Sequence, residues 1–291
     1  MKIFVPTIND DIDDFLKLFE IWSIIQDVRS RVTFDFSKCK FLRQNAVAFL
    51  GGVARYLQDR GIKVEFMFNT LSDWIKMNLR QNGFISAFDD SDNGPWRGNS
   101  IPYFEVHDEE YVRPYLEDKW LGRGWVNVSD KLKNVIIGKV YEIYANAFEH
   151  SKSSIGVFSC GQYFKTLNEL KLTVVDFGVG IPHNVRSYLN KHIDAVAAIA
   201  WAFKEGNSTR VDENYAGGLG LGLLKDFIEV NNGKMEVFSH NGYCLIDKDG
   251  QHLRTLEGCF EGTIINITLM CDEVFYCLDY EEESTGGFFI I

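Results

Sequence analysis

Apolar residues recur along residues 1–88 with two different periods, and the period changes from segment to segment. Short apolar runs typical of strands are separated by longer runs with apolar residues three and four positions apart, the spacing of helices that bury one face. The predicted strands cover 1–6, 31–37 and 62–68, and the predicted helices cover 10–28, 45–61 and 71–84. Strands that alternate with helices indicate a small α/β sheet.

The stretch "DDSDNGPWRGNS", residues 89–100, interrupts this alternation. Its cluster of Asp, Asn, Gly and Pro is typical of a loop or linker, and the pattern that follows it is mixed. An acidic run near the C-terminus is typical of a solvated, peripheral segment. The predicted organisation is a small domain, a connecting segment, a larger domain and an acidic tail: residues 1–88, 89–128, 129–272 and 273–291.

The larger predicted domain begins with a long helical run, residues 129–150. One apolar stripe of this helix contains Ile136, Val140, Ile143, Tyr144 and Ala147. Strands are then expected near 155–162, 171–176, 234–239, 243–247 and 261–270, and helices over 183–204 and 220–231, with a polar loop at 205–216 between the helices. This order again predicts an α/β fold.

Composition narrows the class of protein. The net charge of −11 argues against broad nucleic-acid binding, though not against a local basic groove. No apolar run reaches the roughly 18 residues of a membrane span, and the N-terminal "MKIFVPT" lacks a signal-peptide pattern. We therefore expect a soluble, cytoplasmic protein. Its six cysteines include no CxxC pair, so free thiols are expected and a zinc site is not.

Polar residues interrupt the long helix at regular intervals. In "YEIYANAFEHS" the spacing of four puts Glu142, Asn146 and His150 close together, away from the apolar stripe. Two interpretations are open. The three residues form a solvated polar face, or they line a site beside the helix.

Two glycine-containing segments follow. In "KLTVVDFGVGIP" a predicted strand runs into Asp176, with Gly178 and Gly180 just after it. Glycines there would let a ligand ring approach the backbone, and Asp176 could accept a hydrogen bond from an exocyclic amine such as that of adenine. The alternative is an ordinary glycine turn. The "DFG" does not indicate a eukaryotic protein kinase, because the chain has no HRD sequence and no kinase glycine loop.

The second segment, "AGGLGLGLLKDFIEVNNG", puts glycines directly before a predicted helix. Backbone N–H groups at a helix N-terminus suit phosphate oxygens. The run fits neither the Rossmann nor the Walker A pattern, and alone it is a weak signal. Further on, "EGTIINITL" predicts a strand with Thr263 near its start, where a hydroxyl could support Asp176 or a water on the base.

The four segments occur in an order that resembles the GHKL family of ATP-binding domains. The family includes histidine kinases, anti-sigma-factor kinases, type II topoisomerases, mismatch-repair ATPases and heat-shock chaperones. "EIYANAFEH" is similar to its N box, "DFGVGIP" and "GGLGLGL" to its two glycine boxes, and "GTIINITL" to its closing strand. The resemblance covers about residues 125–272. It implies a Bergerat α/β sandwich, with a mixed sheet covered by helices.

The resemblance also implies roles and cofactors, namely ATP and Mg²⁺. Asn146 would bind the Mg²⁺ that bridges the triphosphate, and Glu142 would act as the general base. Asp176 would read adenine, with Gly178 and Gly180 admitting the base. The phosphates would be cradled by Gly218, Leu219, Gly220, Leu221 and Gly222.

Other polar residues have open roles in this resemblance. The loop between the glycine boxes would be the ATP lid, from which Lys204 or Arg210 could approach the γ-phosphate, and a solvated charged loop is the alternative. Lys225, one turn beyond the glycines, could also face phosphate. Thr263 would support the base-binding carboxylate. For His150, helix-end packing and ligand contact both stay open.

Residues 1–88 resemble a STAS domain, as found in anti-sigma-factor antagonists. The resemblance lies in the order of strand, turn, helix, Gly and strand over "RVTFDFSKCKFLRQNAVAFLGGVARYLQDRGIKVEFMF", followed by a short helix ending in Gly-Phe. The turn that carries the phosphorylatable serine of that family is here "RQNA", Arg43 to Ala46, which has no hydroxyl. Ser37 comes too early in the pattern. A phosphorylation switch at this turn is therefore not expected.

Three functions fit the resemblance. The first is an ATP- and Mg²⁺-dependent switch with slow hydrolysis, which binds a protein partner through the STAS-like domain or the closed lid, or forms a homodimer. The second is an anti-sigma-type serine kinase acting on a STAS partner. A sensor histidine kinase fits least well, because "VHDEEYVRP" at His107 is not flanked by long heptad helices.

Overall fold

The computed structural model describes residues 1–89, 98–204, 206–207 and 222–279, which form two sheets and a set of helices, so the predicted α/β class is confirmed. The described strands are β1 (Lys2–Phe4), β2 (Val32–Asp35), β3 (Val64–Met67), β4 (Ser100–Val106), β5 (Val157–Phe164), β6 (Glu169–Asp176), β7 (Lys234–Asp247) and β8 (Gly250–Met270). The described α-helices are α1 (Ile12–Gln26), α2 (Gln44–Asp59), α3 (Asp73–Gln81), α4 (Phe84–Phe88), α5 (Val112–Tyr115), α6 (Asp130–His150), α7 (Gly180–Leu189), α8 (Ala195–Ala202) and α9 (Gly222–Val230).

The two sheets differ in strand direction. The N-terminal sheet has the order β1-β2-β3 with parallel pairs. The larger sheet has the order β4-β5-β6-β8-β7, and each of its described pairs is antiparallel, where the sequence predicts a mixed sheet. The reason is local, because β5–β6 and β7–β8 are consecutive strands joined by short turns, and such hairpins are antiparallel.

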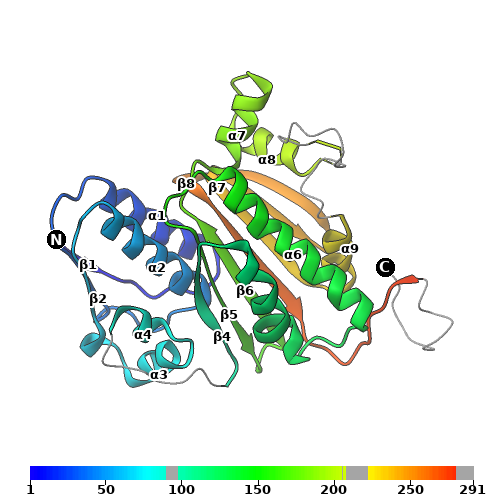
Figure 1. Cartoon of the computed structure of the whole chain (residues 1–291), viewed down its shortest axis with the longest axis horizontal. Coiled ribbons are helices and arrows are strands. Elements are labelled where there is room, and N and C mark those ends of the chain that lie inside the picture. Colours follow the sequence, from blue (N-terminus) through cyan, green and yellow to red (C-terminus); the bar gives the residue numbers. More distant parts are fainter. Residues whose placement is uncertain (90–97, 205, 208–221, 280–291) are drawn as a thin grey trace.

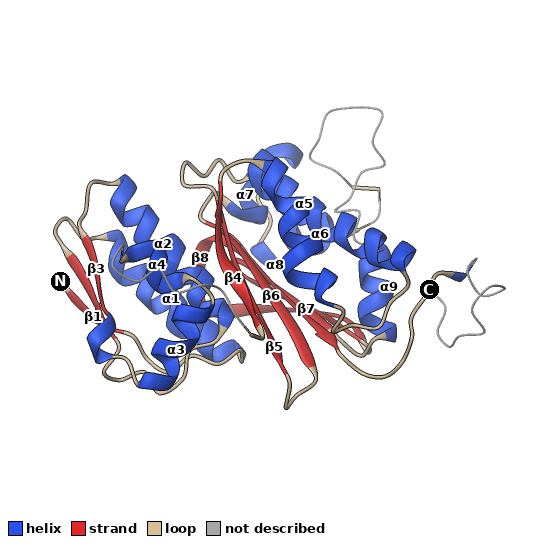
Figure 2. Cartoon of the chain, turned by 60° about the horizontal axis from the view of Figure 1, so that its bottom comes forward, coloured by secondary structure: helices blue, strands red, loops and turns tan. Residues whose placement is uncertain are grey.

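Helices cover both faces of the larger sheet. Helices α1 and α2 lie between it and the small sheet, and α6, α8 and α9 lie on its opposite face (Figures 1 and 2). The core on the N-terminal side joins α1 and α2 to Phe158, Phe238 and Phe260 of the larger sheet. Residues 1–88 and the larger sheet therefore share one hydrophobic core across the predicted linker.

Alternation along each strand distributes side chains between these two cores. On β6, Leu172 and Val174 face the α6 side, whereas Val175 faces the N-terminal layer. Both faces of β6 are covered, so its residues from Leu170 to Asp176 are buried whichever way they face. The same alternation fixes which face the residues at the end of β6 can reach.

Some elements differ from the sequence prediction. The helix expected over 183–204 is two helices, because Asn190 ends α7 in the left-handed conformation (φ 49°) and Asp194 caps α8 through the Ala197 N–H. Strand β7 is continuous where two strands were expected. All six cysteines are free, as predicted. In the described part of the chain, no helix is long and apolar enough to cross a membrane.

Candidate functional site

Helix α6 supplies the first part of the candidate site. The five residues of its predicted apolar stripe are all buried, so this prediction is confirmed. Glu142, Asn146 and His150 lie outside that stripe and are partly exposed. The Glu142 carboxylate is 3.0 Å from Lys139 Nζ, and its side chain is 41% exposed. Glu142 can therefore reach a molecule beside the helix without disturbing the core.

The loop after β6 supplies the second part. Strand β6 ends at Asp176, whose side chain is buried and accepts a hydrogen bond from the Gly178 N–H at 2.9 Å. Burial raises the pKa of Asp176 from 3.8 to about 6, although hydrogen bonds from Gly178 and Thr263 favour the ionised form. At neutral pH the group is a buried carboxylate that can accept a further hydrogen bond.

Three neighbouring strands each place a polar residue at the end of the sheet where β6 stops. Thr263 of β8 is directly opposite Asp176 of β6, and Ser239 of β7 is directly opposite Thr263. By strand alternation all three face the α6 side, next to buried Val174 and Val237. Ser239 Oγ accepts from the Ile181 N–H at 3.0 Å and donates to the Gly262 carbonyl at 2.9 Å. The Thr263 side chain is hydrogen-bonded to Asp176, and its part in binding a base stays a prediction.

The sequence did not single out Ser239, although a signal was present. On β7 the alternate positions Met235 and Val237 are buried and apolar, and Ser239 is the next position on the same face. A small hydroxyl residue after two buried apolar residues on the same face indicates that the apolar core ends there and that a polar group can be bound.

The end of α6 is joined directly to the loop after β6. The Val179 N–H donates to the Ser151 carbonyl at 2.8 Å, and Asn184 Nδ2 on α7 donates to the His150 carbonyl at 2.9 Å. The helix end that carries Asn146 is thus fixed beside the loop that carries Asp176. The His150 carbonyl accepts one of these hydrogen bonds, and the role of its side chain stays a prediction.

The two glycines of this loop are required by the fold itself. A Cβ on Gly178 would lie 1.9 Å from the Ser151 carbonyl oxygen. Gly180 has φ 72°, and its Cβ would lie 2.3 Å from the Glu261 carbonyl oxygen. Backbone packing alone therefore explains why glycine stands at both positions, and neither glycine by itself indicates a ligand.

The predicted phosphate-binding segment is only partly described. Arg210, Gly218, Leu219, Gly220 and Leu221 lie outside the described residues. Gly222 is the first described residue of α9, and Lys204 is exposed after α8. Lys225 lies near enough to Cys244 of β7 to favour its thiolate, although burial still raises the pKa of that thiol to about 11.

The residues around α6 suit a metal–nucleotide complex better than a bare metal. Within the described parts of the chain, no three His, Cys, Asp or Glu side chains gather into a metal site. Mg²⁺ accepts one or two protein oxygens together with phosphate and water oxygens. The amide oxygen of Asn146 fits that requirement, with a triphosphate supplying further ligands.

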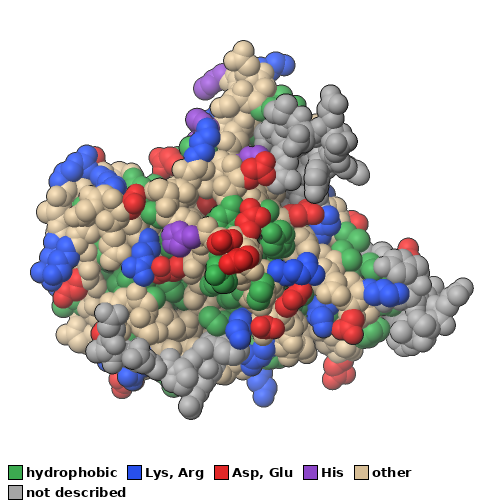
Figure 3. All heavy atoms as spheres, viewed as in Figure 1, with side chains coloured by type: hydrophobic (Ala, Val, Ile, Leu, Met, Phe, Trp, Pro, Cys, Tyr) green, Lys and Arg blue, Asp and Glu red, His purple; other side chains and the backbone are tan. Residues whose placement is uncertain are grey.

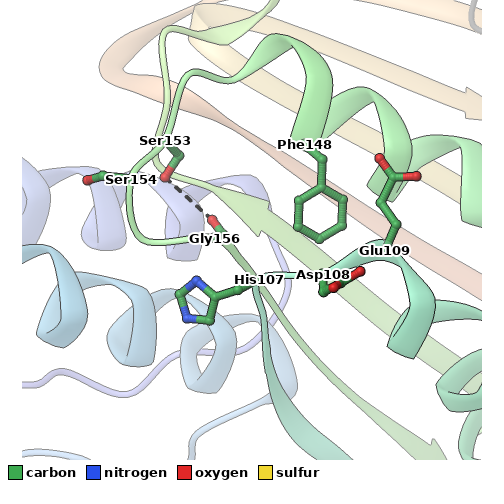
Figure 4. Close-up of a pocket in the computed structure, with 7 residues that line it drawn as sticks. All are labelled: His107, Asp108, Glu109, Phe148, Ser153, Ser154 and Gly156. Atoms are coloured by element: carbon green, nitrogen blue, oxygen red, sulfur yellow. Dashed lines mark hydrogen bonds between the residues drawn. The ribbon is translucent and has the colours of Figure 1, made fainter.

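A separate hollow of about 520 Å³ lies on the other flank of α6 (Figure 4). It is lined by His107, Asp108, Glu109, Phe148, Ser153, Ser154 and Gly156. Phe148 is two positions beyond Asn146, hence about 200° around the helix axis, so the hollow is distinct from the candidate nucleotide site. Its lining includes the acidic side chains of Asp108 and Glu109, so an anion would not be drawn into the hollow. Figure 3 shows acidic side chains near the middle of the face in view.

The turn Arg43–Ala46 lies at the start of α2, against the larger sheet. Gln44 and Asn45 are fully buried. The Gln44 amide is 3.4 Å from Thr173 Oγ1 and 3.4 Å from Asn266 Oδ1. This turn, which the STAS resemblance makes the phosphoacceptor position, is therefore inaccessible to another protein.

Comparisons with known proteins leave the family of this chain open. Neither a scan against protein-family models nor a search of curated proteins gives a match. The functional assignment therefore depends on the motifs and the contacts described above.

Proposed function

We propose that this protein binds ATP with Mg²⁺ and acts as a nucleotide-dependent switch with slow ATP hydrolysis. The observation that carries the proposal is the meeting of two sequence motifs at one edge of the larger sheet. The end of α6, with Asn146, is hydrogen-bonded to the loop that follows Asp176. These motifs are separated by about 30 residues in the sequence, and each resembles a GHKL box by its sequence alone.

Each residue would have a distinct role in the bound complex. The carboxylate of Asp176 would accept a hydrogen bond from the exocyclic amine of adenine, and Thr263, directly opposite on β8, would help to hold that carboxylate in place. Asn146 would ligate the Mg²⁺, which supplies charge neutralisation for the phosphates. Glu142 would orient and deprotonate the attacking water, since its carboxylate is partly exposed on the same side of α6.

The burial of the Arg43–Ala46 turn bears on the choice between a switch and a serine kinase. Because Gln44 and Asn45 are buried and hydrogen-bonded or packed against the larger sheet, the N-terminal layer would not serve as the kinase substrate. A kinase would need a separate STAS partner. His107 lies just after β4 and is not on a long helix, which disfavours a sensor histidine kinase.

Thermal unfolding with and without Mg²⁺ and ATP tests the proposal. Ligand at 100 times its dissociation constant should add about 2.7 kcal/mol to the free energy of unfolding. Absence of any shift at millimolar nucleotide would refute an ATP site. Incubation with γ-labelled ATP, alone and with candidate STAS proteins, then separates the two activities, since a switch with ATPase activity releases free phosphate and a kinase labels protein.

A further inference from the structure

The residue that follows Asp176 leaves the sheet on the opposite face. Phe177 is buried among aromatic rings, with centroids at 5.4 Å from Trp22, 5.5 Å from Phe49 and 5.3 Å from Phe260. Trp22 is on α1 and Phe49 is on α2. Two adjacent residues thus join the candidate nucleotide site to the N-terminal layer.

Helix α2 has a glycine, Gly52, at the position where the Phe177 ring packs against it. A Cβ on Gly52 would lie 1.9 Å from Phe177 Cε2, and a Cβ on Gly51 would lie 2.0 Å from the Tyr103 hydroxyl oxygen. Glycine inside a helix costs about 1 kcal/mol relative to alanine. The two consecutive glycines are explained by two neighbouring sockets, of which only the Gly52 socket holds a residue of the loop.

A second contact ties α1 to β8 beside the same loop. Trp22 Nε1 donates to the Glu261 carboxylate on β8. The Glu261 carbonyl oxygen is the atom that a side chain at Gly180 would meet first. The N-terminal layer therefore contacts the loop directly through Phe177, and through Trp22 it contacts the strand that lies beside Gly180.

We propose that Phe177 is a positioning residue and that its seat against Gly52 sets the position of Asp176, and with it the preference for adenine over guanine. The inference rests on the proposed ATP site. Adenine presents an amine donor where guanine presents a carbonyl acceptor, so a carboxylate discriminates between them only if it is held at the right place. A partner that moved α2 would change nucleotide affinity through the same seat.

The adjacent glycines provide a matched pair of variants. Gly52→Ala fills the socket of Phe177, whereas Gly51→Ala fills the socket of Tyr103, with the same chemical change on the same helix. We expect Gly52→Ala to lower the ratio of ATP to GTP affinity about tenfold or more, a change of about 1.4 kcal/mol, and Gly51→Ala to leave it nearly unchanged. Phe177→Leu added to Gly52→Ala should restore part of the ratio by emptying the socket.

Amide hydrogen exchange supplies a readout without nucleotide. The N–H groups of Gly178 and Val179 are hydrogen-bonded to Asp176 and Ser151, so a displaced loop should lose protection there. We expect that loss in Gly52→Ala and not in Gly51→Ala. If Gly52→Ala does not fold, Phe177→Leu alone is measured by the same readouts against the parent protein.

The outcomes separate the inference from the proposed function. Equal effects of Gly51→Ala and Gly52→Ala on exchange and on the ATP-to-GTP ratio would overturn the inference. If the parent protein binds no ATP, the proposed function fails. Selective exchange at residues 178 and 179 in Gly52→Ala would then still support the seat, and unchanged exchange would overturn it as well.

Discussion

Asp176 should destabilise the protein at neutral pH, so replacing it with asparagine should make the fold more stable. Its pKa is raised from 3.8 to about 6, mainly because burial removes water from the carboxylate. A buried charge without a charged partner normally lowers stability. Its presence is understandable if the charge serves binding, since functional residues often reduce stability.

The pKa shift gives both the sign and the size of the effect. Between pH 3.8 and about 6 the folded protein binds the proton more tightly than the unfolded chain, so stability falls as pH rises through this window. A difference of about 2 pKa units corresponds to about 3 kcal/mol at 1.36 kcal/mol per unit. Ionisation of Asp176 therefore lowers the free energy of unfolding by this full amount above pH 6 and by almost nothing below about pH 4.

We expect Asp176→Asn to raise the free energy of unfolding by about 2–3 kcal/mol at pH 7.5 and by little near pH 4. The asparagine oxygen can still accept from the Gly178 N–H, and its amide can donate to the Thr263 hydroxyl across the strand pair. Urea denaturation at several pH values measures the difference. ATP binding by the same variant should be weaker than that of the parent, because an amide accepts the adenine amine less strongly than a carboxylate.

Asp35 provides a control of opposite sign. Hydrogen bonds from Lys2 and Ser37 hold the pKa of its carboxyl below the usual value. Asp35→Asn should therefore cost stability at neutral pH, and that cost should shrink as pH falls below the usual aspartate range. If Asp176→Asn were also destabilising at pH 7.5, or if its effect were the same at every pH, the argument from a buried ionised carboxylate would be wrong.

Two further predictions concern α6 and the buried hydrogen bonds that join Thr173, Asn266 and Glu236. Glu142→Ala should keep ATP binding and slow phosphate release about 10²–10⁴-fold, whereas Asn146→Ala should lose the Mg²⁺-dependent part of ATP affinity, as measured by calorimetry with and without the metal. Equal behaviour of the two variants would favour a solvated helix face. Asn266→Ala should lower the free energy of unfolding by about 2–3 kcal/mol in urea denaturation, because its amide joins Thr173 and Glu236 in the core. The control Asn78→Ala, whose amide bonds a backbone carbonyl of its own helix α3, should change it by less than about 0.5 kcal/mol.

The sequence predicts those parts of the fold that local periodicity determines. The apolar stripe of α6 and the end of β6 at Asp176 follow from spacing along the chain, and both are found where expected. The break at Asn190 between α7 and α8 was missed, because a single left-handed residue interrupts an otherwise helical pattern. The continuous β7 was missed because its bulge near His240 looks like a turn in the sequence.

Contacts between distant segments could not be predicted from the pattern. The pairing of Ser239 with Thr263 depends on strand register, which the sequence of either strand leaves undetermined. The sequence of α2 does not show why residues 51 and 52 are glycines, because the side chains that lie against them, Tyr103 and Phe177, come from distant segments. The contact of α6 with the loop after β6 was expected only through the resemblance to known ATP-binding domains.

The shared core has a consequence for how the site is held. Without the N-terminal layer, the larger sheet would expose Phe158, Phe177, Phe238 and Phe260, an apolar surface of a kind that soluble domains rarely leave uncovered. On the same face, the buried Lys171 pairs with Asp10 of the N-terminal segment. Separating the layers would break the ion pair between Lys171 and Asp10 and leave Lys171 with Glu169 of its own strand. The N-terminal layer is therefore firmly packed on the sheet that carries Asp176. A partner that regulated the site through this layer would act by shifting α1 or α2 slightly, not by separating the layer from the sheet.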